Sequence, residues 1–219
     1  MGTGPLRGLK VVDISGAVAG PWVSSHLAEQ GADVILIEKV GVPDVMRVTG
    51  ALVGDQSGSW VQMHRNKRGL DLDIRTETGC SILKQLVSTA DVFIQNFRPG
   101  VAERLAIGYE DLKLLNPELV YLSVSGFGPD GPYSDRPVYD PIIQAMSGMT
   151  EAQNGTYVKA VVADKTAAMT GVNAVLSALW ARSNGVGGQH VEINLMDCML
   201  HWMWLEVFWN EAVPDAEPT

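Results

Sequence analysis

The sequence has few cysteines, little positive charge and a small share of charged residues. Cys80 and Cys198 are its only cysteines among 219 residues, which excludes a disulfide framework and favours a reducing, cytoplasmic setting. Lys and Arg number 16 against 25 Asp and Glu, so the net charge is −9. Phosphate backbones and anionic membranes need a basic surface, so neither nucleic acid nor a membrane is expected as a partner.

Several diagnostic patterns are also missing. No run of 18 apolar residues occurs, so no membrane-spanning helix is predicted, and the first residues lack the apolar core of a secretory signal. The four histidines show no metal-ligand spacing, so no metal site is expected. The turn after the first predicted strand is not G-x-G-x-x-G, and G-x-S-x-G does not occur in the sequence, which argues against a standard dinucleotide site at that turn and against a serine hydrolase.

What the sequence does contain is an alternation of strand and helix patterns. Short apolar runs typical of buried parallel strands cover residues 9–14, 33–38, 91–95, 119–124 and 189–195. Helical patterns cover residues 21–29, 76–90, 164–182 and 196–210. Pro21 suits the first position of its helix. We therefore predict an α/β fold, a Rossmann-like parallel sheet flanked by helices, with residues 1–219 forming one domain.

The last predicted helix is apolar on most sides. It carries Trp202, Met203, Trp204 and Phe208 on more than one face, and such a helix must be buried on most sides. Charged residues make up only 19% of the chain, below the roughly 25% usual in globular proteins. We expect either a partner subunit or further chain beyond residue 219 to cover this helix.

Three segments favour a phosphorylated ligand. The turn over residues 15–21 is rich in Gly and Ala and lies between a strand and a helix, as anion sites often do. The basic run 64–69 and the loop 95–100, with Arg104 beyond it, supply positive charge that can bind phosphate. For the basic run, a solvated turn between strands is the favoured interpretation and a phosphate site the alternative.

Two acidic residues lie at predicted starts of helices. Asp164 opens the predicted helix 164–182, where Asp is a favoured N-cap. The same position stabilises an ionised carboxylate and so suits a nucleophile. Tyr139-Asp140-Pro141 follows a turn-rich stretch and is predicted as a junction between a loop and a helix.

The chain resembles the class III coenzyme A transferases. This family includes formyl-CoA transferase, the carnitine and bile-acid CoA transferases and alpha-methylacyl-CoA racemase. The resemblance extends from Leu6 to about Met199. Its motifs are residues 5–13 (PLRGLKVVD), 19–21 (AGP), 31–39 (GADVILIEK), 66–68 (NKR), 70–72 (LDL), 96–100 (NFRPG), 115–117 (LNP), 125–128 (SGFG), 139–140 (YD), Asp164 and 188–197 (GQHVEINLMD).

The resemblance implies a large Rossmann-like domain, a smaller domain and a homodimer of two interlocked subunits. Family members are longer than 219 residues, so this chain corresponds to the N-terminal part of the large domain. The small domain and a returning C-terminal segment are expected beyond Thr219. Coenzyme A is implied as a co-substrate, with no tightly bound cofactor.

The resemblance also implies the site. An aspartate matching Asp164 attacks the acyl-CoA, which leads through an aspartyl anhydride to an aspartyl-CoA thioester, and a carboxylic acid then takes over the CoA. The residues implied to bind CoA are Ala17, Ala19, Lys39, Lys67, Asn96, Phe97, Arg98 and Arg104. Lys39 and Lys67 match phosphate- or adenine-contacting positions. Val18, Tyr139 and Asp140 are implied to contact the substrate.

Two departures from the family pattern bear on the reaction. The racemase branch has a His-Asp pair where this chain has Tyr139-Asp140, which favours a transferase. Formyl-CoA transferase has a glutamine where this chain has Val18, so a less polar acyl group than oxalate is expected. An acyl-CoA racemase or epimerase, and a truncated CoA-binding chain without activity, remain the alternatives.

Overall fold

The computed structural model describes residues 3–209. In this part of the chain, six parallel strands form one sheet and two short strands form a separate antiparallel pair. The sheet consists, in spatial order, of β5 (Lys67–Asp71), β2 (Asp33–Glu38), β1 (Lys10–Asp13), β6 (Val92–Gln95), β7 (Val120–Ser125) and β8 (Gln189–Asn194). This order, 3-2-1-4-5-6 along the chain, is that of the Rossmann fold. The predicted fold class is confirmed.

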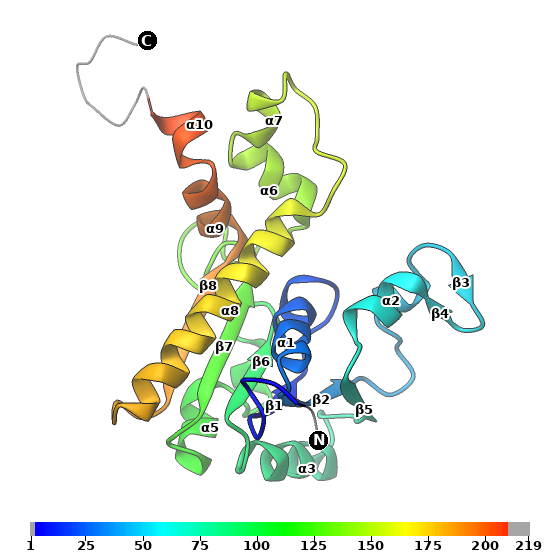
Figure 1. Cartoon of the computed structure of the whole chain (residues 1–219), viewed down its shortest axis with the longest axis vertical. Helices are drawn as coiled ribbons and strands as arrows, with labels where there is room; N and C mark the ends of the chain where they lie inside the picture. The colour runs from blue at the N-terminus through cyan, green and yellow to red at the C-terminus, as the bar shows by residue number, and fades with distance from the viewer. Residues whose placement is uncertain (1–2, 210–219) are drawn as a thin grey trace.

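Helices cover both faces of the sheet (Figure 1). The helices on one face are α1 (Ala19–Glu29), α8 (Val162–Ser183) and α9 (Leu195–Trp202), and those on the other are α3 (Glu77–Val87) and α5 (Tyr109–Leu115). Successive strand residues point to opposite faces. Val11 accordingly packs in the first of two hydrophobic cores and Val12 in the second.

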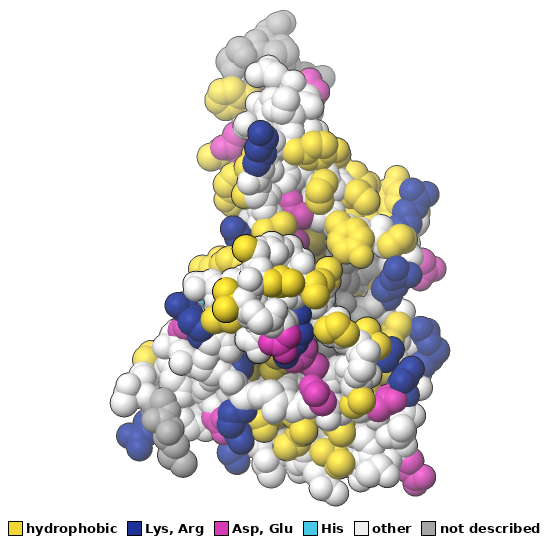
Figure 2. Space-filling view, turned by 90° about the vertical axis from the view of Figure 1, so that its right-hand side faces the viewer, with side chains coloured by type: hydrophobic (Ala, Val, Ile, Leu, Met, Phe, Trp, Pro, Cys, Tyr) yellow, Lys and Arg dark blue, Asp and Glu magenta, His cyan; other side chains and the backbone are white. Residues whose placement is uncertain are grey.

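The remaining elements lie at the margins of the sheet. They are η1 (Val45–Val48), β3 (Leu52–Val53), β4 (Gln56–Ser57), α2 (Gly58–Met63), α4 (Val101–Arg104), α6 (Asp140–Met146), α7 (Met149–Ala152) and α10 (Trp204–Phe208). Figure 2 views the molecule from the side on which β3, β4 and α2 project; hydrophobic side chains spread over the middle of this face. None of the helices within residues 3–209 has the length and apolar character needed to cross a membrane.

Two helices begin earlier than predicted. Helix α1 starts at Ala19, so Pro21 is its third residue and not its first. Proline is tolerated there because the N–H groups of the first turn lack intrahelical partners anyway. Helix α8 starts at Val162, so Asp164 is also a third residue and is not the N-cap.

Two further differences concern the edges of the fold. The predicted last helix is interrupted at Met203, which divides it into α9 and α10; its predicted end, Asn210, lies outside the described residues. The basic run 64–69 is partly strand, because Lys67 begins β5. Beside β2, this strand completes the edge of the sheet.

Candidate active site at the switch point of the sheet

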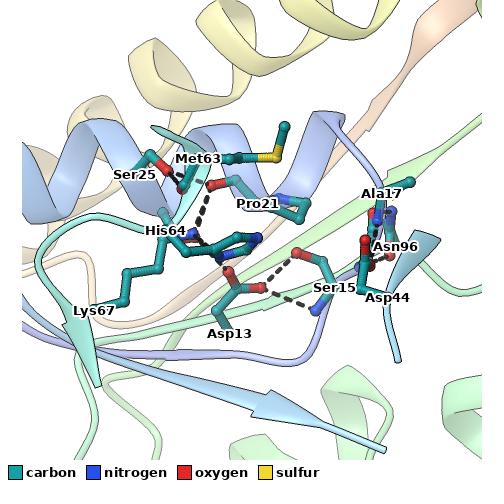
Figure 3. Close-up of polar contacts among 12 residues, drawn as sticks. Asp13, Ser15, Ala17, Pro21, Ser25, Asp44, Met63, His64, Lys67 and Asn96 are labelled. Atoms are coloured by element: carbon teal, nitrogen blue, oxygen red, sulfur yellow. Dashed lines mark hydrogen bonds and ion pairs between the residues drawn. The ribbon is translucent and has the colours of Figure 1, made fainter. Parts of the chain in front are cut away.

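The order of strands reverses between β1 and β6, and ligands of open α/β sheets bind at such a point. The turn after β1 and the loop after β6 meet there through Asn96 (Figure 3). The Asn96 Oδ1 atom accepts the Gly16 N–H at 2.9 Å, and its Nδ2 donates to the Gly16 carbonyl at 2.7 Å. Asn96, predicted to line a CoA channel, therefore also fixes the first βα turn.

One N–H group of the first turn, that of Ala17, is already bound by a carboxylate of the chain. Ala17 has φ = 60°, in the left-handed region, and its N–H donates to the Asp44 carboxylate at 2.8 Å. The other Asp44 oxygen accepts the Met46 N–H at 2.7 Å. A carboxylate of the chain itself thus binds the Ala17 N–H, so that group is not free for a phosphate.

A buried ion pair lies beneath the turn (Figure 3). The Lys67 Nζ atom lies 3.6 Å from the Asp13 Oδ2, and the two side chains are 1% and 0% exposed. Asp13 also accepts hydrogen bonds from the Ser15 N–H at 2.9 Å and from the Ser15 and Ser24 hydroxyls. Lys67 donates to the Pro21 carbonyl at 2.8 Å. These contacts join β5, β1 and α1.

The surroundings of Lys67 do not fit its implied contact with CoA. Its ammonium points inward and is buried, so the side chain acts on the frame of the site and not on a ligand. Burial lowers the pKa of Lys67, and Asp13 offsets part of that shift. The neighbouring His64 is neutral, because burial and the positive charges of Lys67 and Arg47 lower its pKa to about 3.

Asp140 caps helix α8 from a distance in sequence. Its carboxylate accepts the N–H groups of Ala163 at 2.6 Å and Asp164 at 3.2 Å, the groups that an N-cap side chain normally binds. Gln144 Nε2 donates to the other oxygen at 2.6 Å, and Asp140 is only 3% exposed. This buried position makes Asp140 a support for Asp164, whereas the neighbouring Tyr139 is 75% exposed.

The environment of Asp164 raises its pKa to about 6. Burial is the main cause, the charge of Asp140 adds to it, and a hydrogen bond with the Ala19 backbone acts in the opposite direction. The sequence predicted that the helix N-terminus would favour the ionised carboxylate. The pKa is raised instead, because burial and the charge of Asp140 outweigh the helix N-terminus, where the Ala163 and Asp164 N–H groups already bind Asp140.

Three of the implied site residues thus come together at the starts of two helices. Val18 is the N-cap of α1 and precedes Ala19, whose backbone contacts Asp164. Val18 and Ala19 are both buried. The start of α1 is therefore the wall next to the candidate nucleophile.

The implied CoA contacts other than Lys67 lie along the carboxyl edge of the sheet. Phe97 lines a cavity of about 290 Å³ with Lys39, and a cavity of about 200 Å³ with Arg98 and Tyr139. Lys39 and Arg98 are exposed. Arg104 is exposed on α4 and lines neither cavity.

Sequence reasoning missed Asp44, Arg136 and Lys165. Arg136 lines the same cavity as Arg98, and Lys165 lines a different one beside α1. Asp44 carried a usable signal: it follows Gly41-Val42-Pro43 after a strand, and Asp is a favoured cap. Arg136 and Lys165 had no local pattern that distinguishes them from other surface cations.

Comparisons with known proteins agree on the family. The profile of CoA-transferase family III matches residues 6–219. Succinate–glutarate CoA-transferase of Agrobacterium fabrum is 37% identical over 88% of this chain and 51% of its own length. Acetyl-CoA:oxalate CoA-transferase of Acetobacter aceti is 37% identical over 91% of this chain and 53% of its own length.

A solved structure agrees as well. A CAIB/BAIF family protein from Brucella suis superposes with a TM-score of 0.91 and 35% identity, over 98% of this chain and 59% of that one. The chain spans about half the length of the curated relatives it matches. The match across nearly all of its residues shows that the chain belongs to CoA-transferase family III.

Proposed function

We propose that the protein transfers coenzyme A from an acyl-CoA to a carboxylic acid, with Asp164 as the nucleophile. The observation that carries this proposal is a half-buried carboxylate with a raised pKa, beside the switch point of a family III chain. The motifs of the family resemblance imply the same residue. Residues 1–219 are proposed to act as one Rossmann-like CoA-binding domain.

The proposed reaction has four balanced steps. The Asp164 carboxylate attacks the thioester carbonyl and the C–S bond breaks. The CoA thiolate is the leaving group, and the product on the enzyme is an acyl-aspartyl anhydride. The thiolate then attacks the aspartyl carbonyl, which releases the donor acid and gives an aspartyl-CoA thioester. The acceptor carboxylate displaces the thiolate to form a second anhydride. Attack of the thiolate on the acceptor carbonyl gives the new acyl-CoA and restores Asp164.

The raised pKa of Asp164 suits this role. A carboxylate with a pKa of about 6 is largely ionised at neutral pH, yet it is more basic than an ordinary aspartate. Nucleophilicity generally rises with basicity, so burial strengthens the nucleophile without leaving it protonated. The charge of Asp140 helps to raise the pKa of Asp164, and its hydrogen bonds fix the start of α8 on which Asp164 lies.

Side chains, and not backbone N–H groups, are proposed to bind the phosphates of CoA. Lys39, Arg98 and Arg136 surround the cavities that meet at Phe97, where Phe97 contributes an apolar surface. Val18 is proposed to contact a less polar acyl group than oxalate. We propose a small dicarboxylic acid as acceptor, because relatives are named for succinate, glutarate, oxalate and malate.

We also propose that the protein works as a homodimer. Trp202, Trp204 and Leu205 are each more than half exposed on α9 and α10. Large apolar side chains gathered in this way mark surfaces that another protein segment covers. The interlocked dimer implied by the family resemblance would bury them.

Trapping of the acyl-enzyme tests the nucleophile. The protein is mixed with a panel of acyl-CoAs, treated with hydroxylamine or borohydride, and analysed by intact and peptide mass spectrometry. We expect a modification on Asp164 that the Asp164→Asn variant lacks. Asp197→Asn is the matched control, because Asp197 is also the third residue of a helix but is exposed; it should be modified at Asp164 like the wild type.

Absence of any adduct from a protein that binds CoA would overturn the proposed nucleophile. Exchange of the α-proton of an acyl-CoA with solvent deuterium, without an acceptor acid, would then indicate a racemase. CoA binding with neither adduct nor exchange would indicate a binding chain without activity.

A further inference from the structure

A third cavity, apart from the proposed CoA contacts, lies next to the start of α8. It has a volume of about 490 Å³ and lies between α1, α2 and α8, with Val18, Trp22, Met63, Val161 and Lys165 among its lining residues. Val18 directly precedes Ala19, whose backbone contacts Asp164. The cavity therefore adjoins the proposed nucleophile through Val18 and extends along α1, although Asp164 is not among its lining residues.

Lys165 is the cation of this cavity that has no acidic partner. Among the described residues, it forms no ion pair within 4.0 Å. The other two charged residues in the lining, Arg65 and Glu29, form an ion pair with each other at 2.6 Å. The Lys165 ammonium lies 5.2 Å from the centre of the Trp22 ring, and its side chain is half-buried.

The Trp22 ring positions the Lys165 ammonium but does not neutralise its charge. A cation over an aromatic face gains a modest attraction, about 0.5–1 kcal/mol at exposed sites, and keeps its full charge. The Trp22 N–H is used elsewhere, since it donates to His26 Nε2 at 2.7 Å. The cavity thus combines an apolar wall with one unpaired and partly desolvated positive charge.

We infer that this cavity binds the second carboxylate of a dicarboxylic acid, with Lys165 as its counter-ion. This inference rests on the proposed function. Asp164 and Lys165 are adjacent on α8, so their side chains leave the helix about 100° apart and face neighbouring parts of one site. The carboxylate that reacts lies at Asp164, the methylene chain lies against Val18 and Trp22, and the far carboxylate reaches Lys165.

This arrangement separates dicarboxylic from monocarboxylic acids of equal length. A monocarboxylic acid would place a methyl group beside the Lys165 ammonium and leave the charge unpaired. A dicarboxylic acid would form a charge-assisted hydrogen bond there. Lys165 is accordingly a specificity-determining residue, whereas the steps at Asp164 do not require it.

The test compares Lys165→Met with Lys113→Met. Lys113 is a matched control, because its ammonium lies 5.2 Å over the Tyr109 ring on α5, away from the cavity. Acceptor kinetics are measured with succinate and glutarate and, as monocarboxylic counterparts, butyrate and valerate. We expect Lys165→Met to raise KM for the dicarboxylates by about tenfold or more. KM for the monocarboxylates and for the acyl-CoA should change by less than about twofold. Lys113→Met should resemble the wild type.

Acylation of Asp164 separates the inference from the function on which it rests. If acyl-CoA labels Asp164 but the Lys165 variant uses glutarate as well as the wild type does, the inference is wrong and the function stands. If Asp164 is never labelled, calorimetric titration with glutarate decides. Binding that is lost in Lys165→Met supports the carboxylate site without the reaction, and no binding to the wild type overturns it.

Discussion

The candidate nucleophile should destabilise the folded chain at neutral pH. Its pKa rises from an ordinary value of 3.8 to about 6, and each unit corresponds to 1.36 kcal/mol between folded and unfolded states. A rise of about two units therefore lowers the free energy of unfolding by about 3 kcal/mol once the carboxylate is ionised. Because the side chain is only partly buried and solvent screens it, we expect Asp164→Asn to raise the free energy of unfolding by about 1–3 kcal/mol at pH 7.

The pH dependence gives this prediction its sign. Between about pH 4 and pH 6 the folded chain keeps a proton on Asp164 that the unfolded chain has released. Because the folded state binds more protons, the free energy of unfolding falls as pH rises through this window. Asparagine does not titrate, so the stabilisation by Asp164→Asn should be near zero below about pH 4 and complete above about pH 6.

Urea unfolding of the wild type and both variants between about pH 4 and pH 7 measures the effect. Asp197→Asn is again the control, because it makes the same change at the third residue of α9 on an exposed side chain. Its free energy of unfolding, plotted against pH, should run parallel to that of the wild type. If the Asp164→Asn curve is also parallel, burial and Asp140 do not perturb Asp164 and the reasoning fails.

Three further predictions concern the frame beneath the site. Lys67→Met leaves the Asp13 carboxylate buried without its cation and should lower the free energy of unfolding by about 3–5 kcal/mol; urea unfolding measures this, and adding Asp13→Asn should restore part of it. Asp44→Ala frees the N–H of Ala17, so hydrogen exchange of that amide should become faster; unchanged protection would contradict the role of Asp44. Gly20→Ala would bring a Cβ within 2.4 Å of the Ser15 side chain and should lower the free energy of unfolding by about 1–3 kcal/mol. A thermal melt equal to the wild type's would refute the close contact.

The sheet could be predicted from sequence because its signals are local. The run Asp33–Glu38 is β2 with the predicted bounds, since near-continuous Val, Ile and Leu residues bounded by turn residues leave few other structures. The break at Met203 could not be predicted. No proline or glycine marks it, and an apolar helical pattern continues across it without interruption.

The residues of the candidate site could be proposed from sequence, but their electrostatics could not. Lys67 looked like a phosphate ligand because neighbouring residues are basic, whereas its position depends on Asp13, 54 residues earlier (67 − 13 = 54). Burial mainly raises the pKa of Asp164, and the charge of Asp140, 24 residues earlier (164 − 140 = 24), raises it further. A single sequence does not reveal which charges the fold will bury together, so contacts distant along the chain reversed both expectations.

The bound N–H groups of Gly16 and Ala17 bear on the proposed binding of CoA. In many Rossmann folds the backbone of the first βα turn binds phosphate directly. In this chain Asn96 and Asp44 bind the turn at Gly16 and Ala17, so the turn acts as a rigid wall beside Asp164. In the proposed function, phosphate binding is therefore assigned to long cationic side chains such as Lys39. The proposed CoA site would then combine a fixed backbone turn beside the candidate nucleophile with adaptable side chains around the nucleotide.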